Sequence, residues 1–467
     1  MPKINPWLEE RIPVAESRGS TLRYIVEVQP GTRETVIKQL GQITNLTVLT
    51  RPAHNYIVVF GPSVVLPHVE AIPEVVKISA DTLAYIKSPF PLFGLPTPAE
   101  TFRPPSQFDP YIGLIHLSEI EIPVGPAHAV ILSPIKALTV NKIHVYTTVT
   151  QREYIGVPEN NKVKVKCAVA DTGIGIVPHL LHPNNSFVEL HSTVPGELPW
   201  DGQGHGTWCL TCAFGDNARH PKWGKCDGVS DPKYLISVKC LSNMGFGMTS
   251  WVLDAIYEVY KRGAKVLSMS LGGPLQGSAI DDDPECRLVN TLKDEMIVVV
   301  AAGNDGVEWS IGSPGASPYV LTVGAWSMTD DDLSWFSSRG PSGEFYRDHP
   351  EVWGKDFAAI GEDLIKPDVC CPGGGRASSE DIDEQILSGC SGWFDPYGDP
   401  VPGFAVMKGT SMATPACAGL IALGVDREII KTALDVKRIM SKYQTKDSEI
   451  GYGLLTWPKL LNLKEGK

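Results

Sequence analysis

The chain has 467 residues, enough for more than one domain or for one large α/β unit. Its composition, 43% apolar and 20% charged, is ordinary for a soluble globular protein. The formal net charge of −12 argues against sequence-independent binding to nucleic acid or to anionic membranes, so we expect neither as a partner. No run of 18 uncharged apolar residues occurs, so we expect no membrane span.

The N-terminus lacks the apolar core of a secretory signal peptide and carries Glu9, Glu10 and Arg11 instead. We therefore expect a cytoplasmic protein, with an extracellular one that has lost a leader as the alternative. The 10 cysteines all fall between Cys167 and Cys417, unlike the dense frameworks of small secreted domains. Reduced thiols are the expectation, and some disulfides are the alternative.

The N-terminal part of the chain predicts a small α+β domain with two helices and four strands. The β-rich runs are 24–28, 45–49, 56–60 and 75–78, and the helical runs are 33–40 and 64–72. Their order, β-α-β-β-α-β, is the ferredoxin-like arrangement. We assign residues 1–20 to an N-terminal extension and 21–87 to this domain. Residues 88–135 are rich in proline at their start and predict an extended linker.

Residues 136–467 predict a larger α/β domain. From Lys162 onward, apolar runs alternate with helical patterns such as 250–262. The apolar runs are 163–170, 235–240, 266–271, 296–302 and 320–325. Because these runs are continuous and not alternating, we expect a parallel β-sheet sandwiched by helices.

Three glycine-marked segments supply a carboxylate, an imidazole and a hydroxyl. They are Ala-Asp-Thr-Gly-Ile-Gly at 170–175, Gly-His-Gly-Thr at 204–207 and Gly-Thr-Ser-Met-Ala-Thr-Pro at 409–415. In an open parallel sheet, reacting groups gather at the carboxyl ends of strands. Asp171 ends one predicted strand and Asn304 follows another, so both are expected at that edge.

With Asn304, these segments resemble the subtilisin-like serine proteases, the subtilase family. The resemblance implies that Ser411 is a nucleophile, His205 its general base and Asp171 the group that orients the imidazole. It also implies that Asn304 and the Ser411 amide form an oxyanion hole. Ser411 is expected at the start of a helix, with Pro415 near its first turn.

The resemblance extends to the residues that contact substrate. It implies that one segment pairs with an extended substrate backbone and that another forms the wall of the specificity pocket. The first comprises Ser270, Leu271 and Gly272, and the second Ala301, Ala302 and Gly303. Since these side chains are small or apolar, we expect a broad, mainly apolar preference among protein or peptide substrates.

The N-terminal domain resembles the inhibitor-I9-like pro-region of many secreted subtilases. This implies a self-processing zymogen whose own pro-domain is a partner, cut in the linker or just after it. We expect a monomer. The family usually has histidine where this chain has Trp208, and we expect little effect from that change. Residues 373–407 predict an insertion of unassigned purpose.

Other enzyme classes fit the motifs less well. Aspartic proteases also use Asp-Thr-Gly, but they need a second copy of that motif, which this chain lacks. An α/β-hydrolase has the order Ser, Asp, His and a Gly-x-Ser-x-Gly motif, whereas Ala413 stands at the fifth position here. Two subtilase-fold alternatives stay open: an inactive module that grips peptides, and a dedicated processing enzyme with few substrates.

We expect no cofactor for the chemistry, and the metal ligands are left unassigned. Structural Ca²⁺ is one interpretation of the acidic runs 281–283 and 330–332, although neither has EF-hand spacing, and solvated loops are the other. Zinc is one interpretation of Cys209 and Cys212 with Cys226, and packing in the core is the other.

Overall fold

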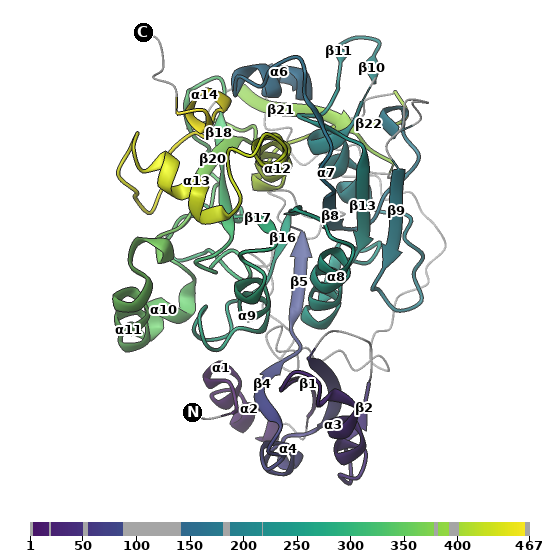
Figure 1. Cartoon of the computed structure of the whole chain (residues 1–467), viewed down its shortest axis with the longest axis vertical. Helices are drawn as coiled ribbons and strands as arrows, with labels where there is room; N and C mark the ends of the chain where they lie inside the picture. Colours follow the sequence, from purple (N-terminus) through teal and green to yellow (C-terminus); the bar gives the residue numbers. More distant parts are fainter. Residues whose placement is uncertain are drawn as a thin grey trace, which may run out of the picture.

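A computed structural model describes residues 3–17, 20–49, 55–86, 142–180, 187–216, 218–377, 382–391 and 401–462. The predicted linker 88–135, and the cut expected there, lie outside the described residues. Figure 1 shows a small N-terminal unit below a larger body that contains the rest of the described chain.

The N-terminal unit is an antiparallel sheet with helices, and each of the six predicted elements is present. Its sheet order is β2-β3-β1-β4, with buried Tyr24, Val36 and Ile57 among its core residues. The elements are α1 (Pro6–Glu9), α2 (Ile12–Ser17), β1 (Thr21–Val28), α3 (Arg33–Leu40), β2 (Thr47–Val48), β3 (Tyr56–Pro62), η1 (Ser63–Val65), α4 (Leu66–Glu70) and β4 (Val75–Ala80). The sequence did not predict α1 and α2.

The body is built on an eight-stranded sheet with the order β19-β18-β17-β15-β8-β13-β9, and β20 pairs with β18. The strands are β8 (Cys167–Asp171), β9 (Phe187–Ser192), β13 (Tyr234–Lys239), β15 (Val266–Met269), β17 (Ile297–Ala301), β18 (Leu321–Ser327), β19 (Asp332–Leu333) and β20 (Val369–Pro372). All pairs are parallel except that of β19 with β18. The predicted parallel sheet is confirmed, with one antiparallel edge strand.

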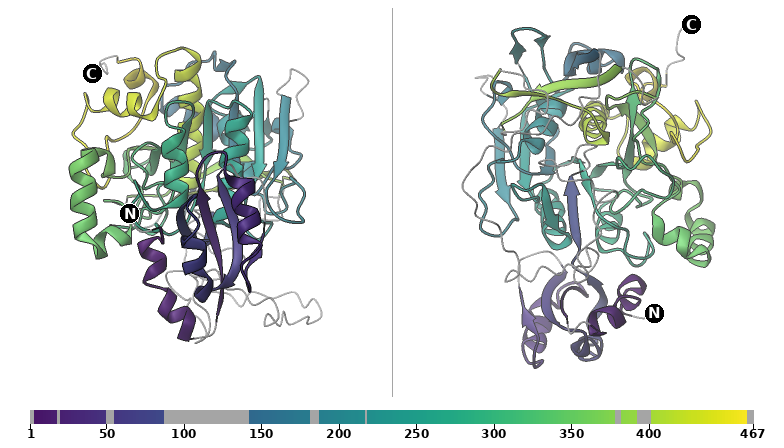
Figure 2. Two further views of the ribbon diagram at one scale, coloured as in Figure 1. Left: turned by 60° about the horizontal axis from the view of Figure 1, so that its bottom comes forward. Right: turned by 180° about the vertical axis from the view of Figure 1, so that it is seen from behind.

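Helices cover both faces of this sheet (Figure 2). On one face lie α7 (His205–Phe214) and α12 (Thr410–Asp426), and on the other α8 (Thr249–Lys261) and α9 (Pro284–Thr291). Alternate residues of a strand enter opposite cores: Val299 packs with α7 and α12, whereas Val298 and Val300 pack with α8 and α9. Burial on both faces explains the continuous apolar runs in the sequence.

Two predicted runs are divided in the structure. Run 163–170 splits into β7 (Lys162–Val163), which pairs with β12 (Asp231–Pro232), and β8. The chain leaves the strand between them because the amides of Lys164 and Val165 donate to Asp426 Oδ1, at 2.6 and 3.2 Å. Run 266–271 likewise ends as β15, and β16 (Leu271–Gly272) joins a different sheet.

The region predicted as an insertion supplies two strands of a three-stranded sheet over α7. The sheet contains β21 (Ile382–Gly389), β22 (Phe404–Met407) and β6 (Lys142–Thr147), which is followed by α6 (Thr148–Tyr154). Trp208 is fully buried beneath it and donates from Nε1 to Ala405 O at 2.9 Å. Trp208 therefore joins the helix of His205 to this sheet.

The remaining elements lie around the body. They are η3 (Pro178–Leu180), β10 (Arg219–His220), β11 (Gly224–Lys225), α10 (Glu344–Asp348), α11 (Pro350–Ile360), η4 (Gly361–Leu364), α13 (Ala433–Met440) and α14 (Trp457–Leu460). A separate three-stranded sheet joins β5 (Leu83–Ile86) to β14 (Phe246–Met248) and β16. Within the described ranges, none of the helices has the length and apolar character needed to cross a bilayer.

Candidate active site

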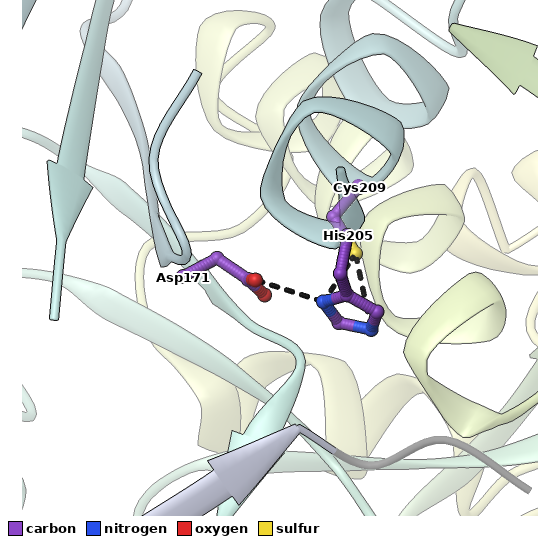
Figure 3. A group of neighbouring side chains, drawn as sticks. All are labelled: Asp171, His205 and Cys209. Carbon is purple, nitrogen blue, oxygen red and sulfur yellow. Dashed lines mark hydrogen bonds and ion pairs between the residues drawn. The ribbon is translucent and has the colours of Figure 1, made fainter. Parts of the chain in front are cut away.

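Asp171 and His205 form a buried ion pair at the carboxyl edge of the sheet. Asp171 ends β8, His205 begins α7, and the ring nitrogen Nδ1 lies 2.8 Å from Asp171 Oδ1. Both side chains are almost fully buried, at 1% and 2% exposure. Figure 3 shows the carboxylate directed at the ring, with the sulfur of Cys209 close to the ring on the helix side.

Asp201 shapes the turn that begins α7. Its Oδ1 accepts from the amides of Gln203 and Gly204, and its Oδ2 from the amide and hydroxyl of Thr207. This carboxylate therefore satisfies amides that the helix start leaves without helical partners. Thr172 Oγ1, in the residue after Asp171, donates to the same carboxylate at 2.9 Å and so ties the two loops together.

Gly206 permits the close approach of these two loops. A Cβ atom on Gly206 would lie 2.5 Å from the carbonyl oxygen of Gly173, which is far inside van der Waals contact. The Gly206 amide donates to Thr172 Oγ1 at 2.8 Å. A larger residue at this position would push His205 away from Asp171.

Two opposing effects act on the His205 imidazole. Burial lowers its pKa, but the negative charge of Asp171 and the hydrogen bond to it outweigh burial, so the pKa of His205 is raised well above its usual value. Burial raises the pKa of Cys209 to about 11 against the lowering effect of His205, so this thiol is neutral at pH 7. The charge that acts on the ring is therefore that of Asp171.

Ser411 is the second residue of α12, whose N-cap is Gly409 with a φ of 144°. Its Oγ donates to Ser270 O at 3.3 Å, and its backbone amide lies in the first helical turn, at the positive end of the helix dipole. Cys209 Sγ lies 3.9 Å from His205 Nε2 and 3.5 Å from Ser411 O. The histidine ring and the start of α12 are therefore neighbours, as the sequence predicts.

Pro415 lies inside α12, beyond the first turn where the sequence places it. In an α-helix its missing amide would bond to the carbonyl of Ser411, four residues earlier. Ser270 Oγ donates to that carbonyl at 3.0 Å, and Cys209 Sγ also contacts it. The proline thus leaves the Ser411 carbonyl available to groups outside the helix.

Asn304 presents an amide group next to Ser411. Its Oδ1 accepts from the amide and hydroxyl of Thr410, at 2.8 and 3.1 Å, which fixes Nδ2 on the other side. Among the described residues, Nδ2 is buried without a hydrogen-bond partner. A buried donor without a partner is costly, so this group is suited to an acceptor brought by a ligand.

The predicted pocket wall lies beside this asparagine. Ala301 ends β17, the Ala302 amide donates to Val323 O, and Gly303 has a φ of 120°. The Gly303 amide donates to Thr410 Oγ1 at 3.2 Å. Thr410 therefore connects the predicted pocket wall to the helix of Ser411.

The predicted substrate strand is already paired in this structure. Leu271 and Gly272 form β16, which pairs antiparallel with β5, and β5 pairs on its other side with β14. Gly272 and Phe246 both face Tyr85, and Gly247 faces Ala84, which is fully buried. In Figure 1, β5 rises from the N-terminal unit into the body, so the chain's own segment fills the predicted substrate position.

Polar contacts fasten the N-terminal unit to the body around this strand. Asp81 accepts from the amide and hydroxyl of Ser250 at the start of α8, at 2.8 and 2.9 Å. Glu27 and Arg287 form a two-pronged ion pair with both distances at 2.8 Å. Further contacts are those of Lys77 with Asp282, of Gln276 with the backbone of Ala80, and of Asn5 Nδ2 with the carbonyls of Gln276 and Asp282.

The acidic runs and the cysteines have partners within the protein. Asp283 caps α9 and Asp330 pairs with Arg376. Within the described ranges, the one group of three potential metal ligands is Asp171, His205 and Cys209, so Cys212 and Cys226 do not join Cys209 in a cluster. Cys209 and Cys212 pack in one hydrophobic cluster and Cys226 in another, as the core-packing interpretation expects.

Three further residues organise the site. In the sequence, Asp201 was visible only as a flanking residue of the His205 segment, Asn243 only as the first residue of a loop that resembles the family loop before this helix, and Lys239 was not singled out. Lys239 is fully buried beside Asp171 and contacts Asn243 Oδ1 at 2.9 Å. The signal available for Lys239 was its place at the end of a largely apolar strand, where an ionisable residue is rarely buried without a partner.

A helix-covered parallel sheet with Asp171, His205, Asn304 and Ser411 at its carboxyl edge has the subtilisin-like architecture. The chain belongs to the subtilase family: residues 162–453 match that family. The match covers each of the four residues.

Known proteins of this family resemble the chain along much of its length. It is 32% identical over 313 residues to serine protease AprX of Bacillus subtilis (strain 168), covering 62% of this chain and 64% of AprX. It is 28% identical over 296 residues to subtilisin of Bacillus pumilus, covering 62% of this chain and 87% of that protein. The chain thus spans less than two thirds of the AprX sequence.

A solved structure with the same fold is that of fervidolysin from Fervidobacterium pennivorans. It superposes with a TM-score of 0.62 at 16% identity, covering 96% of this chain and 62% of fervidolysin. At this level of identity the likeness supports the fold alone.

Proposed function

We propose that the protein is a serine endopeptidase that hydrolyses peptide bonds with Ser411, His205 and Asp171. The observation that carries this proposal is the buried Asp171–His205 pair beside the start of α12, together with Asn304 Nδ2, a buried donor to which the described residues offer no hydrogen-bond partner. The names of the relatives, serine protease and subtilisin, support the same activity.

In the proposed reaction, Ser411 Oγ attacks the substrate carbonyl carbon while His205 Nε2 takes the hydroxyl proton. Asp171 stays ionised, accepts a hydrogen bond from Nδ1–H and stabilises the imidazolium that forms. The oxyanion receives hydrogen bonds from Asn304 Nδ2 and from the Ser411 amide. His205 then gives its proton to the leaving amine, and water repeats the sequence in reverse to release the acid.

We also propose that the protein is made as a zymogen inhibited by its N-terminal unit. The support is β5, which occupies the space between β14 and β16 where an extended substrate would pair. The carbonyl of Ser270, next along the chain from β16, accepts from Ser411 Oγ. The strand end at Ile86 is therefore directed toward the nucleophile, and the first cut is expected within the residues that directly follow Ile86.

Pairing of the substrate backbone with two strands favours broad specificity, because main-chain hydrogen bonds do not depend on the identity of the substrate side chains. Buried Ala84 and the small residues of the predicted pocket wall support a preference for small and apolar side chains. A cleavage survey on a peptide mixture distinguishes this from a dedicated processing enzyme, which would cut few of the peptides.

The decisive experiment is intact-mass analysis after reaction with a fluorophosphonate, which phosphonylates the oxygen of an activated serine and releases fluoride. We expect one adduct on the wild type, mapped to Ser411, and none on Ser411→Ala or His205→Ala. The exposed Ser441→Ala variant is the matched control and should label like the wild type. An unlabelled wild type, with the N-terminal unit removed, would leave the peptide-gripping module as the better explanation.

Self-processing has a separate test. The wild type should shed an N-terminal fragment on incubation, whereas Ser411→Ala should keep its full mass. Equal masses for both proteins under conditions where the wild type labels would refute self-processing and leave the protease activity intact.

A further inference from the structure

Lys239 is a buried cation next to the proposed catalytic aspartate. It ends β13, its side chain has 0% exposure, and in the pairing of β13 with β8 it lies opposite Asp171. A lysine is almost never fully buried unless its ammonium group is paired, so its partners are informative.

The ammonium group has three partners within hydrogen-bond distance. Nζ donates to Thr172 O at 2.7 Å and to Asn243 Oδ1 at 2.9 Å, and it forms an ion pair with Glu197 Oε2 at 3.1 Å. An ammonium group has three protons, so these contacts use its full donor capacity.

The three partners belong to different functional loops. Thr172 follows Asp171 directly. Asn243 precedes β14, one of the two strands that hold β5, and its Oδ1 also accepts from the amide of Gly202, three residues before His205. Glu197 Oε2 closes the network by accepting from the Asn243 amide at 3.0 Å.

We propose that Lys239 is a positioning residue that sets the loops of Asp171 and His205, and the start of β14, relative to one another. The proposal rests on the serine protease activity proposed above. Lys239 touches none of the reacting atoms, so it acts through Thr172 and through the Asn243–Gly202 bond. The loop before His205 has little freedom to compensate, because a Cβ on Gly202 would come within 2.8 Å of the Asn243 side chain.

A merely structural ion pair would behave differently. Loss of a structural lysine lowers the unfolding temperature but leaves the folded enzyme as active as before. Loss of a positioning residue lowers the rate of the folded enzyme, because a misplacement of about 1 Å can cost on the order of 10²-fold.

The test measures the second-order rate of fluorophosphonate labelling on the full chain. Each variant is labelled about 20 °C below its own melting temperature, so that every variant is folded. Intact mass spectrometry compares species that have the same N-terminus. The probe is small and does not need strand pairing, so it reports the triad itself. The variants are Lys239→Met, which keeps the length of the side chain, and Asn243→Ala, which removes the link to Gly202 together with one of the three partners of Lys239.

Lys437→Met is the matched control. Lys437 is 3% exposed, donates to Pro318 O and pairs with Asp368, away from the site. We expect labelling to slow roughly 10–100-fold in Lys239→Met and to slow in Asn243→Ala, with Lys437→Met less stable but as fast as the wild type.

The outcomes separate the two proposals. If the wild type itself does not label, the protease activity is wrong. If the wild type labels and Lys239→Met labels at the same rate, the positioning role is wrong and Lys239 is structural. If Lys239→Met does not fold, Asn243→Ala decides, because its side chain is at the surface end of the network and an unchanged rate would overturn the inference.

Discussion

Asp81, a residue of the N-terminal unit, caps the start of helix α8 in the body. The N-cap residue, Met248, offers no side-chain hydrogen bond, and Asp81 of the N-terminal unit accepts from the Ser250 amide and hydroxyl instead. Arg23, in the same unit as Asp81, holds the carboxylate in place at 2.7 Å. The helix start is therefore capped across the interface, and Asp81→Ala should weaken docking of the N-terminal unit.

The size of the effect follows from the two bonds that cross the interface. Losing an N-cap carboxylate costs about 0.5–2 kcal/mol, and a second hydrogen bond to a charged group contributes about 1.5 kcal/mol. Together they predict that docking is weaker by about 2–3.5 kcal/mol, which corresponds to roughly 30–300-fold. Since Asp81 is fully buried, solvent does not screen these bonds.

Hydrogen exchange of the uncut Ser411→Ala chain measures this directly. Amides of the peptide that contains β14 and Ser250 exchange when β5 undocks, so Asp81→Ala should speed their exchange by the factor above. Glu34→Ala is the control, because Glu34 belongs to the same unit but is 81% exposed and pairs only with Arg33. If exchange in the β14 peptide is the same in Asp81→Ala and in the parent chain, the capping argument is refuted.

Three further predictions concern catalysis and stability. Asn304→Ala should lower kcat by roughly 10²–10³ with KM unchanged in steady-state kinetics; this size is that of an oxyanion-hole asparagine in a subtilisin and is not calculated from the present structure. Because the pKa of His205 is raised and only the neutral ring can act as base, kcat/KM should rise with pH through a midpoint above 6.5, and Asp171→Asn should lower that midpoint. Trp208→Phe should lose about 1–3 kcal/mol in a thermal scan, because it removes the indole donor to buried Ala405.

Each of these has a contradicting outcome. An unchanged kcat in Asn304→Ala would remove the asparagine from the oxyanion hole. A midpoint at or below 6.5 would mean that burial, and not the aspartate, governs the imidazole. An unaltered melting temperature in Trp208→Phe would show that the sheet over α7 does not depend on the indole.

The sequence predicted the sheet and its catalytic edge because both depend on local patterns. Continuous apolar runs require burial on both faces, and a polar residue that ends such a run, as Asp171 does, lies at the strand's carboxyl end. Family resemblance supplied the grouping of Asp171, His205, Asn304 and Ser411. Their roles, the domain boundaries, structural Ca²⁺ and the location of the protein stay predictions.

What the sequence did not predict depends on contacts between distant segments. Strand β5 is only four residues long, and its partners, β14 and β16, come much later in the chain. Asp201 and Lys239 gain their significance from the backbone groups that folding brings to them. Pro415 was expected near the first turn of the helix and lies just beyond that turn, four residues after Ser411.

All ten cysteines are buried in the described structure. A thiol reagent can therefore modify the native protein only when a segment opens, and the rate for each thiol reports the opening of its own surroundings. Modification of Cys209 reports the opening of α7, the helix of His205. Modification of Cys286 reports the opening of the start of α9 beneath the N-terminal unit, and that of Cys417 the opening of α12, the helix of Ser411. The chain thus contains its own set of chemical probes, which can follow undocking and unfolding separately without the introduction of any label.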